Sequence, residues 1–101
     1  MIEKLEGIKQ RYDLLTEKIA DPAVIAKMDE WKKMAKERAD MEDTVNKYIE
    51  YKKVEADKIA AEESLLIESD PDMKSLLEEE VFECKKQLES LVEELKILLL
   101  P

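Results

Sequence analysis

The chain has 101 residues, 43 % of them charged and 45 % apolar, with a formal net charge of −9. Glycine occurs once and proline three times, and this near-absence of turn residues is typical of long amphipathic helices rather than of a sheet. One cysteine and no histidine exclude a disulfide framework, a zinc cluster and a histidine-dependent catalytic triad, so no metal and no cofactor is expected.

The first predicted helix covers residues 2–20. Its apolar residues alternate in steps of four and three, which places them on one stripe of a helix: Met1, Leu5, Ile8, Tyr12, Leu15 and Ile19. Asp21 followed by Pro22 predicts a break and a new start, because Asp caps free backbone N–H groups and Pro fits the first helical turn. A short helical segment is expected over residues 22–28, with Asp29 as the cap of the next helix.

A long helix is predicted over residues 30–67, where glycine and proline are absent. Its expected stripe shifts by one position after Tyr48, since 3.6 residues per turn do not divide evenly into seven. The stripe comprises Trp31, Met34, Met41, Val45 and Tyr48, then Ile49, Ala56, Ile59 and Leu66.

A second break at Asp70 and Pro71 precedes the last predicted helix, residues 71–99. Its apolar stripe has no polar exception: Leu77, Val81, Cys84, Leu88, Leu91, Leu95 and Leu98. Short corners make sequential helices antiparallel neighbours. The sequence therefore predicts an all-α, antiparallel three-helix, coiled-coil-like bundle over residues 1–101, with one long central helix and a short extra helical turn after the first helix.

The last five residues run from Ile97 to Pro101 without a polar side chain. This apolar ending leads us to expect a single domain cut from a longer protein, and self-association of the fragment. We find no signal peptide and no run approaching the roughly 18 apolar residues of a membrane span, which predicts a cytoplasmic protein with no membrane partner.

The negative charge is concentrated in the last helix. Residues 1–60 hold 13 basic and 14 acidic residues, whereas residues 61–101 hold 4 and 12. Nucleic acid backbones are bound by Lys and Arg, so direct sequence-specific nucleic acid binding is not expected of the chain as a whole. An acidic face is better suited to binding a basic protein surface, or it serves only to keep the protein in solution.

Several residue groups are candidate sites, and each also has an ordinary structural interpretation. The carboxylate pairs Glu79 with Glu83 and Glu89 with Glu93 resemble cation ligands, but charged helices normally expose such pairs to solvent. Cys84 lies on the apolar stripe near Glu83, which predicts a buried thiol with a raised pKa rather than a nucleophile.

Aromatic and basic residues are the remaining candidates for a partner surface. Trp31 and Tyr48 fall on the stripe and are expected in the core or at its rim, whereas Tyr51 falls off it and is expected to be exposed. A basic cluster is either a contact patch or a balance for nearby carboxylates: Lys32, Lys33, Lys36 and Arg38. Nothing in the pattern has the geometry of an active site, so the sequence predicts a binding or positioning domain and not an enzyme.

Four sequence segments match one protein family in their order and spacing: MIEKLEGIKQRYDLLTEKIADPAVI, KERADMEDTVNKYIEYKKV, ESDPDMKSLLEEEV and LVEELKILLLP. Together they resemble the N-terminal helical domain of bacterial class I peptide chain release factors of the type that reads UAA and UAG. The resemblance covers essentially the whole chain.

The resemblance implies a parent protein that enters the ribosome, recognises a stop codon and promotes peptidyl-tRNA hydrolysis in translation termination. In the family, hydrolysis belongs to a Gly-Gly-Gln loop with a methylated glutamine, and codon reading to a tripeptide loop; Gly7 is the only glycine here, so no catalytic residue is carried over. The implied partners are the remaining domains of the parent and the ribosome, at the stalk base of the large subunit. An autonomous helical scaffold or oligomerisation module is the alternative.

Overall fold

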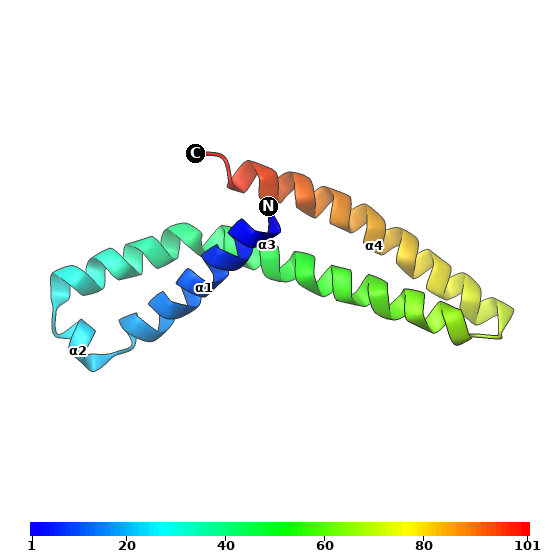
Figure 1. Cartoon of the computed structure of the whole chain (residues 1–101), viewed down its shortest axis with the longest axis horizontal. Helices are drawn as coiled ribbons and strands as arrows, with labels where there is room; N and C mark the ends of the chain where they lie inside the picture. Colours follow the sequence, from blue (N-terminus) through cyan, green and yellow to red (C-terminus); the bar gives the residue numbers. More distant parts are fainter. The chain divides into compact units, whose positions relative to one another are not determined.

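The structure, a computed structural model, describes all residues from 1 to 101. It contains four helices and no strand: α1 (Ile2–Ile19), α2 (Pro22–Ile25), α3 (Met28–Ile67) and α4 (Pro71–Leu98) (Figure 1). The all-α fold, the long central helix and the short helix after the first are therefore confirmed. The chain forms two compact units, residues 1–46 and 47–101, and α3 contributes to both.

Both Asp-Pro breaks start helices in the way the sequence predicts. The Asp21 carboxylate accepts a hydrogen bond from the Ala23 N–H at 2.9 Å, and the Asp70 carboxylate accepts one from the Asp72 N–H at 3.1 Å. In each case the proline occupies the first helical turn, where its missing N–H leaves no partner unsatisfied.

The connection between α2 and α3 differs from the expectation. Helix α2 ends at Ile25, and α3 already begins at Met28. The Trp31 N–H donates to the carbonyl oxygen of Lys27 at 3.0 Å, so the first helical bond of α3 starts before Asp29. Asp29 therefore lies inside the first turn, near the positive end of the helix dipole, and the prediction that it caps α3 is wrong.

In the first unit, α1 runs antiparallel to the first part of α3, with α2 in the connection (Figure 1). Leu5 and Leu15 are buried on α1, in agreement with the predicted stripe, and Val45 is buried on α3. The prediction fails at Met1, which is exposed at the start of the chain. The Trp31 indole N–H donates to the carbonyl oxygen of Ile19 at 2.9 Å. This bond satisfies an otherwise unpaired carbonyl at the end of α1 and anchors the turn to α3.

In the second unit, the remainder of α3 runs antiparallel to α4 (Figure 1). The core cluster consists of Val54 from α3 with Cys84 and Leu91 from α4, and Tyr51 and Leu88 pack against it as partly buried residues. The four-three stripe predicted for α4 is thus the face that packs on α3. Along it Cys84, Leu91 and Leu95 are buried, whereas Leu98 is exposed near the end of α4, so the prediction that Leu98 packs in the core is wrong.

The predicted stripe is wrong in the second half of α3. Ile49, Ala56, Ile59 and Leu66 were expected to face the core, but all four are exposed. The less exposed positions begin three residues after Tyr48 instead of one: Tyr51, Val54, Lys58, Ala61 and Leu65. This face also follows steps of three and four, and it is the one that meets α4.

Candidate interaction surfaces

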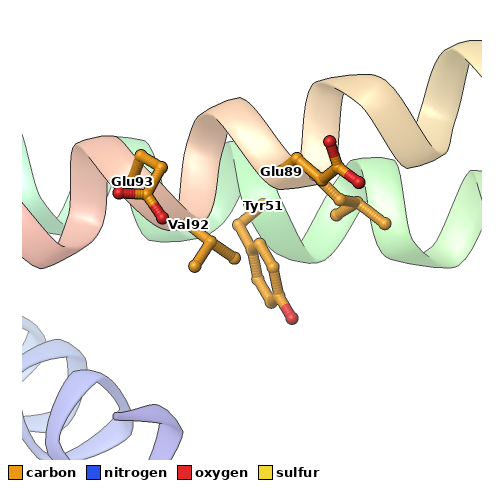
Figure 2. Close-up of a pocket in the computed structure, with 5 residues that line it drawn as sticks. Tyr51, Glu89, Val92 and Glu93 are labelled. Carbon is orange, nitrogen blue, oxygen red and sulfur yellow. The ribbon is translucent and has the colours of Figure 1, made fainter.

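A groove in the second unit lies between α3 and α4. It is lined by Tyr51 of α3 and by Leu88, Glu89, Val92 and Glu93 of α4. Figure 2 shows the Tyr51 ring beside Val92, with the carboxylates of Glu89 and Glu93 projecting from α4. The groove therefore combines an apolar wall with two carboxylate groups.

Tyr51 was expected to be exposed, but it is partly buried against the core cluster. Its ring stacks on that of Tyr48, with centroids 6.5 Å apart and planes inclined by 15°. The hydroxyl donates to the Glu55 carboxylate at 3.1 Å. Burial, and then the nearby Glu55, raise the pKa of Tyr51, so the phenol stays protonated and neutral at physiological pH. Tyr51 is a wall of the groove, with its polar end satisfied by its own helix.

Cys84 is buried in the α3–α4 core, as the stripe predicts. Burial is the main cause that raises the pKa of its thiol, and the charges of Glu80, Asp57 and Glu83 raise it further. A reactive cysteine needs the opposite surroundings, namely a positive charge and access to solvent. The predicted burial of Cys84 is confirmed.

The four residues of the predicted basic cluster have different surroundings in the structure. Lys32, Lys33 and Lys36 are exposed on α3. Lys36 pairs with Asp40 at 3.2 Å, one turn along the same helix. Arg38 is half-buried: its Nε donates to the Thr16 hydroxyl at 2.8 Å and its guanidinium lies 4.4 Å from the centroid of the Tyr12 ring. Arg38 thus joins α3 to α1, and only the three lysines face solvent.

The carboxylate pairs are exposed along α4, at Glu79, Glu83, Glu89 and Glu93. Glu93 accepts a hydrogen bond from Lys96 at 3.4 Å, a single contact on the helix surface. No three His, Cys, Asp or Glu side chains come together in a group able to hold a metal ion. The solvent-exposed interpretation of these pairs agrees with the structure.

Two ion pairs between helices carried no signal in the sequence. Arg11 of α1 donates to both oxygens of Glu37 of α3, at 2.8 and 2.9 Å, and Lys47 of α3 lies 3.0 Å from Glu94 of α4. The hydrogen bonds raise the pKa of Arg11 and lower that of Glu37, and the Glu94 carboxylate raises the pKa of Lys47. Each pair joins residues far apart in the chain, so only the packing of the helices reveals it.

The helices expose both acidic and apolar side chains. None of its helices is both long enough and apolar enough to pass through a lipid bilayer.

Comparison with known proteins places the chain in a family. The PCRF domain matches residues 8–101. Proteins described as "Peptide chain release factor 1" from Clostridium botulinum and Clostridium beijerinckii are each 46 % identical over 101 residues, and that from Clostridium acetobutylicum is 44 % identical. These matches cover the whole chain but 28 % of each relative, so the chain spans little more than a quarter of their length. No solved structure matches.

The resemblance to bacterial class I peptide chain release factors is thereby confirmed, and nothing supports the alternative of an autonomous scaffold. The chain belongs to the PCRF domain family of peptide chain release factors.

Proposed function

We propose that this chain is the ribosome-positioning domain of a cytoplasmic translation termination factor that reads UAA and UAG. The match of the PCRF domain to residues 8–101 carries the proposal. The short share of each relative that the chain covers supports a parent in which further domains follow this N-terminal one. Those domains would read the codon and promote peptidyl-tRNA hydrolysis, since a single glycine excludes a Gly-Gly-Gln loop from these residues.

The surface chemistry supports a role in placement. Helix α4 exposes a row of carboxylates, and the groove between α3 and α4 has a neutral tyrosine, Tyr51, as one wall. An acidic surface is attracted to basic protein components, and the stalk base of the large ribosomal subunit is the site that the family resemblance suggests. In this proposal the domain orients the factor and takes no part in the chemistry.

Peptide release by the complete factor tests the proposal. Release is measured at UAA, UAG and UGA codons, over a range of salt, for the intact factor and for one lacking residues 1–101. We expect the deletion to lower the efficiency of release at UAA and UAG and to leave UGA unread. If the deletion confers reading of UGA, the domain takes a direct part in decoding and the placement role is wrong.

A charge variant isolates the contribution of α4. Glu79→Gln with Glu83→Gln neutralises two exposed carboxylates of α4, and Glu3→Gln with Glu17→Gln neutralises two exposed carboxylates of α1 as a matched control. We expect the α4 pair alone to weaken release at low salt and to flatten its salt dependence, because screening acts over about 8 Å at physiological ionic strength. Equal effects of the two pairs would contradict docking through α4.

We also propose that the isolated chain self-associates through its apolar C-terminal residues. Ile97 and Leu100 are well exposed to solvent. Sedimentation at several protein concentrations, with Ile97→Ser plus Leu100→Ser as the comparison, measures this. A monomer at all concentrations would contradict the proposal.

A further inference from the structure

A second groove lies in the second unit, close to the corner between α3 and α4. It is lined by Ile59, Glu62, Glu63, Leu65 and Leu66 of α3 and by Val81 of α4. Leu66 is 85 % exposed and Ile59 47 % exposed, although the sequence pattern suggests core positions for both. Phe82, the residue after Val81, is 60 % exposed. Exposed apolar side chains that gather in one place are a common feature of interaction surfaces.

The charge around the groove restricts which molecule fits. Residues 59–83 hold nine Asp and Glu side chains and a single Lys. Two of the acids, Glu62 and Glu63, line the groove itself, and only Glu62 has a nearby cation, Lys58 at 3.7 Å. The groove therefore combines apolar side chains with an acidic rim formed by Glu62 and Glu63.

We propose that this groove binds a basic amphipathic helix of a partner protein. Such a helix inserts apolar side chains between Leu66 and Val81 and places Lys or Arg against the acidic rim. Nucleic acids and anionic membranes carry the same sign of charge as the rim and are repelled by it. A second copy of this chain packed through the same groove would bring the same negative charge against it.

The inference does not rest on the proposed ribosomal role, because it follows from exposure and charge alone. The probe is a synthetic 18-residue helical peptide of leucine and lysine, with a peptide of leucine and glutamate as its counterpart. Titration into the 101-residue chain is followed by amide chemical shifts and by calorimetry. We expect the lysine peptide to shift amides within residues 59–83 and the glutamate peptide to cause no shifts.

Two neighbouring substitutions provide a matched pair. Leu66 lines the groove and Ile67 does not, yet both are almost fully exposed at the end of α3, so neither change disturbs the fold. Leu66→Ser should weaken binding of the lysine peptide about tenfold or more, as expected for losing one large apolar contact. Ile67→Ser should change it less than about twofold, and Glu63→Gln should weaken binding and reduce its salt dependence.

Three results would overturn the proposal. The first is equal loss of binding in the Leu66→Ser and Ile67→Ser variants, which indicates non-specific attraction. The second is a pattern of shifts centred on Glu89 and Glu93 instead of the corner. The third is equally tight binding of the glutamate peptide. None of these results alters the outcome of the release assay, so the two proposals fail independently.

Discussion

Substitution of Leu91 tests the packing of the α3–α4 core directly. It is 4 % exposed and belongs to the cluster formed with Val54 and Cys84. Truncation to Ala removes three carbon atoms, and at about 0.8 kcal/mol per buried CH₂ group the lost burial amounts to about 2.4 kcal/mol. The cavity left behind adds to this cost.

The geometry of the cluster limits the cavity term. Leu88 and Tyr51 pack at its edge and are only partly buried, so they have room to move toward the vacated space. We therefore expect Leu91→Ala to lower the free energy of unfolding by about 2.5–3.5 kcal/mol, within the range of about 2–5 kcal/mol for buried Leu→Ala changes. The melting temperature should fall by about 10–28 °C.

Urea unfolding followed by circular dichroism at 222 nm measures the change. Leu76→Ala is the matched control, because Leu76 lies on the same helix, undergoes the same change and is 60 % exposed. The control should leave the unfolding midpoint nearly unchanged. If Leu91→Ala costs no more than Leu76→Ala, Leu91 does not belong to the core and the register of α4 on α3 is wrong.

Four further predictions concern single positions. Gly7→Ala should raise stability by about 0.8–1.0 kcal/mol in thermal melts, because a Cβ at this position in α1 meets nothing within 4 Å; a loss of stability would contradict the helix there. Asp70→Ala should cost about 1 kcal/mol in urea unfolding through loss of the α4 cap, and Asp70→Asn should restore most of it. Cys84 should react with a thiol reagent at pH 8 far more slowly in the native chain than in urea, and equal rates would place the thiol at the surface. The hydrogen bond from Arg11 lowers the pKa of Glu37, so the stability that this ion pair contributes is complete above the ordinary pKa of 4.5 and is lost as the pH falls through the lower pKa of the folded state. In melts recorded from neutral to acid pH, Glu37→Gln should therefore reduce the loss of stability on acidification. An unchanged pH dependence would refute the role of this pair.

Local chemistry in the sequence was enough to place the breaks between helices. Asp21 with Pro22 and Asp70 with Pro71 start α2 and α4 because a carboxylate cap and a proline in the first turn act within a few residues of chain. The burial of Cys84 was predictable for a similar reason. Helix α4 has one continuous apolar stripe, so no other face competes for the core.

The second half of α3 shows where sequence alone was insufficient. It carries two apolar stripes, one through Ile59 and Leu66 and one through Val54 and Leu65, and periodicity does not distinguish them. Packing against α4 selects the second stripe and leaves the first exposed beside the corner. The same packing brings Lys47 to Glu94, 47 positions apart in the chain. Which stripe of α3 is buried depends on the helix that packs against it, because a contact removes apolar surface of both helices from water at once. Only the tertiary structure supplies that partner.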